Sequence, residues 1–343
     1  FILAQVLMRS SLALPCALLG ILLLSVTLEA HGAAGRGLPF TAKSPHGGSW
    51  RGAPLAQDNN VIAWKGIEYG RGKRFQLSQL LNQTKNIDAL NYGPSCIQSP
   101  ALLGSQGNTT VSEDCLFLNV YVPREHFEAP AAQPLPVVLY IHGGAFSFGS
   151  GAPLSLNPAV YTQRKVILVS INYRLNLLGF MALPNLPFTN FGLLDQRVAM
   201  EWVRSNILSF GGNPKQVTLI GDSAGAISIL HHITSPLHLR DPLFHRGIVI
   251  SAGIFAGQEY TLPKAHRQHL KLAGHLGCPT TPNEALECLL ALPAKSVRVI
   301  TTRFPSPFIA AFPMEQRLTG YPLNDRTFFP DLAEALSSGK FDR

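Results

Sequence analysis

Charged side chains are scarce in this sequence. Asp, Glu, Lys and Arg account for 14% of its 343 residues, against roughly 25% in an average soluble domain. The formal charge is still +8, but the basic residues are scattered, and the cluster of Arg71, Lys73 and Arg74 has no basic neighbours. The sequence has no basic stripe interleaved with aromatic residues, which argues against a nucleic-acid partner.

Polar side chains are nearly absent between Leu12 and Leu24. A single Arg9 precedes this run and small residues at 32–34 follow it, which is the pattern of a cleaved signal peptide. The run is short for a spanning helix and has no charged stop-transfer flank, so we favour cleavage, with no stable membrane span, over a membrane anchor. We expect residues 1–34 to be a signal peptide, with 1–7 as a possible non-native leader ahead of the first Met.

Closely spaced cysteine pairs are also absent. Cys16 lies in the predicted signal peptide, and the four remaining cysteines lack the C-x-x-C spacing that zinc sites favour, so no metal site is expected. An even number of cysteines in an oxidising compartment predicts two disulfides, with three possible connectivities. The simplest connectivity joins Cys96 to Cys115 and Cys278 to Cys288.

Two sequons begin at Asn82 and at Asn108, and they predict glycosylation of both asparagines on an extracellular surface. Together with the signal peptide and the expected disulfides, they indicate a protein that is secreted or lies in the lumen of the endoplasmic reticulum.

Apolar runs alternate with amphipathic segments, without internal repeats or low-complexity tracts. Several runs are nearly continuous in Val, Ile and Leu, which is typical of strands covered on both faces. The expected strands are 115–122, 137–141, 166–171, 217–220 and 247–250. Residues 194–210 between the third and fourth strands have helical spacing, and a strand, a helix and a strand in succession predict a parallel sheet. The predicted class is α/β, a mostly parallel central sheet with helices on both faces. From residue 262 onward the pattern is helical.

A G-x-S-x-G motif follows the strand 217–220 and precedes an apolar segment of small residues. It comprises Gly221, Asp222, Ser223, Ala224 and Gly225. A serine hydroxyl is a weak nucleophile unless it projects from a sharp turn where a base reaches it, and such a turn tolerates little beyond hydrogen at its flanks. The motif therefore predicts Ser223 as a catalytic nucleophile.

A second small-residue segment directly follows the strand 137–141. It runs from His142 through Gly143, Gly144 and Ala145 to Phe146. A Gly-Gly pair after a strand is usually only a tight turn, but the order and spacing here favour a loop whose N–H groups converge on an anion. We expect these groups, with the N–H of Ala224, to form an oxyanion hole facing the Ser223 hydroxyl.

Six ordered motifs make the sequence resemble the type-B carboxylesterase and cholinesterase family, from Gly66 to its end. They are residues 112–120, the loop Gly143-Gly144-Ala145-Phe146, Asn172-Tyr173-Arg174, residues 192–196, residues 210–214 and residues 221–226. The resemblance implies an α/β-hydrolase, a partial domain at 35–343 and a serine carboxylic-ester hydrolase that forms an acyl-enzyme on Ser223 and acts on a small-molecule ester without a cofactor. Both short-range disulfides match bridges expected in that family. By the same resemblance Gly143, Gly144 or Ala145, and Ala224 line the oxyanion hole, with Ala145 where many relatives carry a third Gly.

Two departures bear on the substrate. Residues 70–73 replace the Pro-rich stretch that usually follows the position of Tyr69 in the family, so the nearby wall of the site is expected to differ. The segment between Cys96 and Cys115 contains neither Trp nor Tyr, so it offers no aromatic platform for a quaternary ammonium group. We therefore favour a general carboxylesterase over a cholinesterase. The alternative is a catalytically inactive cholinesterase-like adhesion or binding protein, against which Ser223 argues.

The acid and the histidine of a triad follow the serine in α/β-hydrolases, in that order. The last histidine is His275, and the histidines between Ser223 and that point are too near the nucleophile in sequence. We expect most of them to be surface or satisfied core groups. Residues 322–341 resemble the family segment just before the acid. We therefore expect the acid and the histidine beyond Arg343, and we expect the chain as given to be a poor esterase.

Overall fold

The computed structural model describes residues 40–99, 110–130, 132–152, 156–252, 262–296 and 332–339. Residues 38–343 group as one unit, and the predicted signal peptide, the Asn108 sequon and residues 322–331 lie outside the described residues. No helix in the described ranges is long and apolar enough to cross a membrane.

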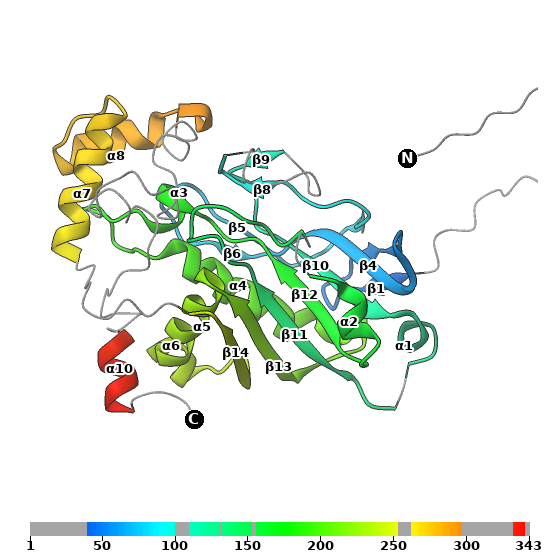
Figure 1. Ribbon diagram of the computed structural model, residues 1–343. Coiled ribbons are helices and arrows are strands. Elements are labelled where there is room, and N and C mark those ends of the chain that lie inside the picture. Colours follow the sequence, from blue (N-terminus) through cyan, green and yellow to red (C-terminus); the bar gives the residue numbers. More distant parts are fainter. Residues whose placement is uncertain are drawn as a thin grey trace, which may run out of the picture. The chain divides into compact units, whose positions relative to one another are not determined.

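A seven-stranded mixed sheet organises the fold, in the order β14-β13-β11-β12-β10-β4-β3 (Figure 1). Its strands are β3 Ala53–Leu55, β4 Asp58–Glu68, β10 Phe117–Pro123, β11 Leu135–Ile141, β12 Ile167–Ile171, β13 Gly212–Asp222 and β14 Arg246–Ile250. The first four strands in the sheet order run parallel to one another, and β10, β4 and β3 continue the sheet with antiparallel pairings. All five predicted strands are present, and the expected mostly parallel sheet describes the half built from β11 to β14, whereas the other half is antiparallel.

Smaller sheets and the helices complete the unit. The remaining strands are β1 Thr41–Lys43, β2 Ser49–Arg51, β5 Gly70–Arg71, β6 Gln79–Leu80, β7 Asn86–Asp88, β8 Ser95–Cys96 and β9 Val111–Ser112. The helices are α1 Arg124–Glu128, α2 Pro158–Thr162, α3 Asn176–Phe180, α4 Phe191–Asn206, the 3-10 helix η2 Ile207–Phe210, α5 Ala224–Thr234, α6 Pro236–Arg240, α7 Leu262–His275, α8 Pro282–Ala291 and α10 Leu332–Ser338. The predicted helix at 194–210 corresponds to α4 together with η2.

Helices cover both faces of the sheet, as expected. Successive side chains on a strand point to opposite faces, so the neighbours of two consecutive residues show what packs on each face. On one face Leu139 of β11 belongs to the main core with Trp202 of α4 and Ile229 of α5. On the other face the next residue, Tyr140, belongs to a smaller cluster with Ala159 of α2. The sheet is therefore the middle layer, and β11 is packed from both sides.

The outermost strand β14 departs from the expectation of burial on both faces. All five of its residues are exposed, with Ile248 and Ile250 46% accessible and Val249 37% accessible. Only one neighbour, β13, pairs with it in the described sheet. The apolar run that predicted a covered strand thus forms the edge of the described sheet.

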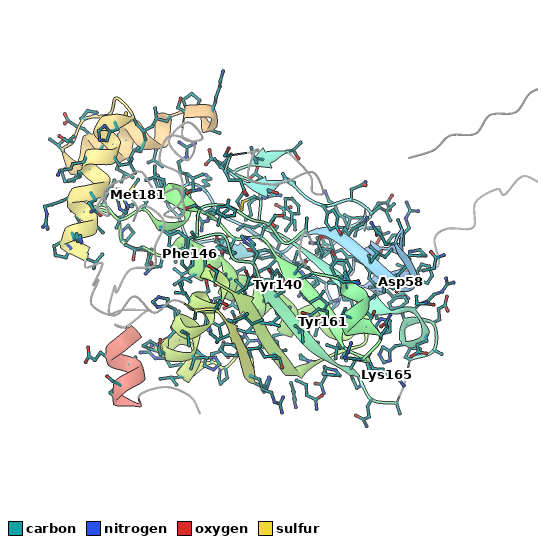
Figure 2. All side chains as sticks on the ribbon, in the orientation of Figure 1. Asp58, Tyr140, Phe146, Tyr161, Lys165 and Met181 are labelled. Atoms are coloured by element: carbon teal, nitrogen blue, oxygen red, sulfur yellow. A yellow bond between two sulfur atoms is a disulfide. The ribbon has the colours of Figure 1, made fainter. Side chains whose placement is uncertain are left out.

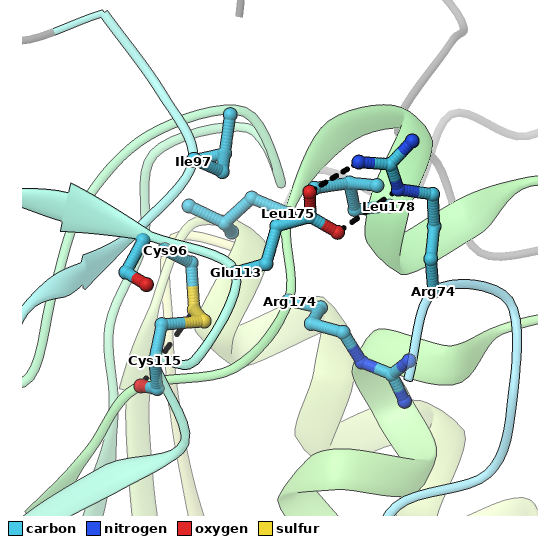
Figure 3. Close-up of a pocket in the computed structure, with 9 residues that line it drawn as sticks. Arg74, Cys96, Ile97, Glu113, Cys115, Arg174, Leu175 and Leu178 are labelled. Atoms are coloured by element: carbon cyan, nitrogen blue, oxygen red, sulfur yellow. Dashed lines mark hydrogen bonds and ion pairs between the residues drawn. A yellow bond between two sulfur atoms is a disulfide. The ribbon is translucent and has the colours of Figure 1, made fainter. Parts of the chain in front are cut away.

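Two disulfides fasten loops to this framework, with the short-range connectivity expected. Cys96 is bonded to Cys115 and Cys278 to Cys288, at Cα separations of 4.9 and 5.7 Å. The first disulfide lines a small pocket beside Arg74 and Glu113, which form an ion pair (Figure 3). The Arg74 guanidinium also donates to the carbonyls of Leu289 and Leu292 at 2.6 and 2.7 Å, which ties the end of α8 to the sheet unit.

Candidate active site

Ser223 lies on the turn between β13 and α5. The strand ends at Asp222 and the helix begins at Ala224, so the expected strand, turn and helix arrangement is confirmed. Its backbone has φ 52° and ψ −116°, a conformation that is strained for a residue with a side chain. The Ser223 N–H donates to the carbonyl of Ile250 at 2.9 Å. Its side chain is partly exposed, and within the described residues no hydrogen bond joins its hydroxyl to another group.

Two glycines allow this turn to pack against the end of β11. A Cβ on Gly225 would lie 2.0 Å from the Ile141 carbonyl oxygen, and one on Gly221 would lie 2.5 Å from the Gly225 carbonyl carbon. Real Cβ atoms essentially never approach closer than 3.0 Å. Both positions of the motif therefore require glycine for a steric reason.

The loop from Gly143 to Phe146 lies beside the nucleophile turn. A Cβ on Gly143 would be 2.7 Å from Oδ2 of Asp222 and 2.8 Å from its carbonyl oxygen. Gly144, Ala145 and Phe146 all have positive φ, of 108°, 52° and 55°. The structure thus brings together the two segments that the sequence places 79 residues apart, counted from Gly144 to Ser223.

Three main-chain N–H groups where this loop meets the Ser223 turn have no acceptor among the described residues. They belong to Gly144, Ala145 and Ala224. Ala224 is the first residue of α5, and the first N–H groups of a helix have no intrahelical partner and carry a partial positive charge. Such donors are suited to stabilise an anionic oxygen.

Tyr140 is a neighbour that sequence reasoning missed. Its hydroxyl donates to Oδ1 of Asp222 at 2.7 Å, directly before the nucleophile (Tyr140 and Phe146 are labelled in Figure 2). The two residues are 82 positions apart, so no local motif could have linked them. This bond holds β11 and the nucleophile turn in register.

Three of the histidines that follow Ser223 contact other groups. His232 bonds to Oε1 of Gln196 at 2.9 Å, His245 accepts from the Val217 N–H at 3.2 Å, and His238 stacks on Phe244 with ring centroids 4.0 Å apart. Burial, followed by the neighbouring His231, Arg197 and His238, lowers the pKa of His232 to about 3. Among the described residues no histidine is hydrogen-bonded to the Ser223 hydroxyl, and no group of three or more His, Cys, Asp or Glu could hold a metal ion.

A buried ion pair joins two further motifs next to the site. The Arg174 guanidinium donates to both carboxylate oxygens of Asp195 at 2.7 Å, and their side chains are 5% and 0% exposed. Ser78 donates a further hydrogen bond to the same carboxylate at 2.7 Å. The pair anchors α4 to the segment after β12, so these buried polar residues serve the framework.

The layered mixed sheet and the serine on a tight turn after a parallel strand define the chain as an α/β-hydrolase. The carboxylesterase family model matches residues 42–341. The chain is 37% identical over 317 residues to an acetylcholinesterase of Bungarus fasciatus, covering 86% of this chain and 50% of that protein. It is 39% identical over 255 residues to a carboxylic ester hydrolase of Bombus ignitus, covering 71% and 44%. A solved PNB esterase superposes with a TM-score of 0.72 at 31% identity, covering 88% of this chain and 61% of that one. The chain belongs to the carboxylesterase family, and it spans about half the length of these curated relatives.

Proposed function

We propose that the protein is a serine carboxylic-ester hydrolase with Ser223 as its nucleophile. The observation that carries this proposal is the strained, partly exposed Ser223 beside the open N–H groups of Gly144, Ala145 and Ala224. An oxygen placed between these donors lies next to a serine hydroxyl that no described residue engages. Family membership supports the same reaction class.

In this mechanism the Ser223 hydroxyl oxygen attacks the ester carbonyl carbon while a base takes the hydroxyl proton. The carbonyl oxygen becomes an oxyanion held by the main-chain donors, each of which contributes roughly 3 kcal/mol in such sites. The carbon–oxygen bond to the alcohol then breaks, the alcohol leaves with the proton, and an acyl-Ser223 ester remains. Water attacks this ester by the same route and releases the carboxylic acid and free Ser223.

The base is not assigned, because no described histidine is hydrogen-bonded to the Ser223 hydroxyl. A serine needs its base within about 2.6–3.2 Å. Without one, the oxyanion hole and substrate binding together retain roughly 10³–10⁴-fold catalysis over water.

The proposed substrates are general carboxylic esters. The segment from Cys96 to Cys115 has no Trp or Tyr with which to bind a quaternary ammonium group. Hydrolysis of an aryl acetate should exceed that of the corresponding choline ester, and the reverse preference would contradict this assignment.

The disulfides and the exposed Asn82 support secretion or a place in the lumen of the endoplasmic reticulum.

An organophosphonate probe tests the nucleophile, because it reacts with an activated serine and not with a merely exposed one. Labelling should be lost in Ser223→Ala and retained in Ser205→Ala, whose serine is exposed on α4. Labelling that survives Ser223→Ala would refute the assignment.

A second candidate is a cholinesterase-like binding protein without catalysis, which the absence of a described histidine partner for Ser223 favours. Folded protein that neither labels at Ser223 nor hydrolyses aryl esters above the rate of Ser223→Ala would support that function instead.

A further inference from the structure

His142 is a buried side chain that the mechanism above does not use. It follows the last residue of β11 and is 4% exposed. Its Nδ1 lies 2.7 Å from the carbonyl oxygen of the next residue, Gly143. A carbonyl oxygen only accepts hydrogen bonds, so Nδ1 carries the ring proton and donates it.

The opposite ring nitrogen is consistent with this tautomer. Nε2 of His142 is buried, and no described residue forms a hydrogen bond with it. A proton there would be a buried donor without an acceptor, whereas the lone pair of a neutral ring is less costly to bury. Burial lowers the pKa of His142 to about 4, against the raising effects of the Gly143 carbonyl and of Asp222. The ring is therefore neutral at neutral pH.

The orientation of the ring is fixed on two sides. It stacks on Tyr173 with centroids 4.4 Å apart and planes 19° apart, and the Tyr173 hydroxyl donates to the His142 carbonyl at 2.9 Å. On another side, a Cβ on Gly149 would lie only 2.4 Å from Nδ1, so that backbone also confines the ring. Gly149 is itself held by Gln98 through two hydrogen bonds of 2.8 Å.

The peptide bond after Gly143 transmits this orientation to the site. In a trans peptide the C=O and the following N–H point in opposite directions. Fixing the Gly143 carbonyl on the His142 ring therefore directs the Gly144 N–H to the other side of the peptide. That N–H has no acceptor among the described residues, and Gly143 itself packs against Asp222 beside the nucleophile.

We propose that His142 is a positioning residue, whose ring Nδ1–H holds the Gly143 carbonyl and thereby directs the Gly144 N–H into the oxyanion hole. This inference rests on the proposed function. The hydrogen bond also helps to maintain a loop in which Ala145 and Phe146 adopt left-handed conformations that side chains disfavour.

Two substitutions at His142 separate positioning from packing. His142→Phe keeps a ring that can stack on Tyr173 but removes the donor, whereas His142→Asn removes the ring but keeps an N–H near the place of Nδ1. With positioning, His142→Phe should lower kcat for aryl-ester hydrolysis by at least about tenfold with little change in KM, up to the roughly 10²–10³-fold cost of deleting an oxyanion donor. His142→Asn should recover much of the kcat lost in His142→Phe, even where it has the lower urea midpoint of the two variants. If His142→Phe keeps the wild-type kcat, or His142→Asn loses more kcat than His142→Phe, the proposal is wrong.

Nitrogen-15 NMR of the imidazole tests the hydrogen bond without turnover. We expect the Nδ1–H tautomer of His142 at neutral pH, and a Gly144 amide resonance that shifts in His142→Phe and returns toward its original position in His142→Asn. An Nε2–H tautomer would overturn the proposal. If wild type and Ser223→Ala hydrolyse esters at the same rate, the proposed function fails instead, and the tautomer still decides whether His142 holds the Gly143 carbonyl.

Discussion

Replacing Gly225 with alanine places a methyl group against the end of β11. The new Cβ would lie 2.0 Å from the Ile141 carbonyl oxygen and 3.1 Å from that of His142, where 3.0 Å is the shortest approach that real structures show. The obstacle is main chain, which cannot rotate away as a side chain would. Helix α5 must therefore separate from β11 by about 1 Å, the difference between the first contact and that limit.

The expected cost combines two opposing effects. Alanine is favoured over glycine inside a helix by about 1 kcal/mol. Overpacking a filled core costs about 1–3 kcal/mol, and more where the neighbours cannot yield. We expect Gly225→Ala to lower the free energy of unfolding by about 2 kcal/mol. Because Ser223 and the Gly143–Phe146 loop meet at this contact, a displacement of that size should also slow phosphonate labelling by about 10²-fold.

Urea unfolding and the labelling rate of Ser223 measure the two effects. Gly274→Ala in α7 is the matched control, because its Cβ would meet only the Thr280 methyl at 3.1 Å. That variant should be as stable as wild type, or up to about 1 kcal/mol more stable, with unchanged labelling. A Gly225→Ala protein that matches the control in both measurements would refute the steric account of the motif.

Three further predictions concern the framework. Acidification should destabilise the fold through His142, His232 and His269, whose pKa values burial lowers to about 4, 3 and 4. Because these rings are neutral in the fold, their contribution to the free energy of unfolding is complete above the unfolded pKa of about 6.5. It is lost as the pH falls below that value, by at most about 1.4 kcal/mol per pH unit and ring. A urea midpoint that stays constant between pH 7 and 5 would contradict this. Asp195→Asn should cost about 3–5 kcal/mol in urea unfolding, because it leaves the Arg174 charge buried without its partner, and a loss below about 1 kcal/mol would show that the pair matters little. We expect the exposed edge strand β14 to cause self-association, which Ile248→Lys should reduce in sedimentation velocity because a charge blocks pairing between strand edges. A wild-type protein that stays monomeric, or association that Ile248→Lys leaves unchanged, would contradict this.

The sequence predicted the central strands well because burial on both faces produces continuous apolar runs. β12 is buried along its whole length, and its expected start at residue 166 differs by one residue from the observed start at Ile167. The antiparallel half was not predicted, since β4 begins with the polar residues Asp58 to Asn60 and β3 has only three residues. The exposure of β14 was not predictable from its composition, because an apolar run is the same whether or not a neighbour covers it.

In the candidate site, too, features set by the local sequence were predicted, whereas contacts between distant residues were not. Ser223 and its flanking glycines were predicted because a strained turn restricts residue types locally. The Tyr140 to Asp222 hydrogen bond joins residues 82 positions apart, so only the sheet register reveals it. The role of the His142 ring was also missed, because the tautomer and the stacking partner that define it are properties of the folded loop.

Ser223 directly follows β13, the neighbour of the edge strand β14 in the described sheet. The ladder between β13 and β14 ends with Asp222 opposite Ile250, and the Ser223 N–H extends that ladder by donating to the Ile250 carbonyl. One side of β14 thus accepts the hydrogen bond from the Ser223 N–H, while its other side meets no strand of the described sheet. A strand added there, from whichever polypeptide, would stiffen β14 through main-chain hydrogen bonds and with it the support of Ser223. Edge pairing is usually regarded as a hazard for a β-sheet. In the proposed hydrolase it would instead change the rigidity of the turn that carries Ser223.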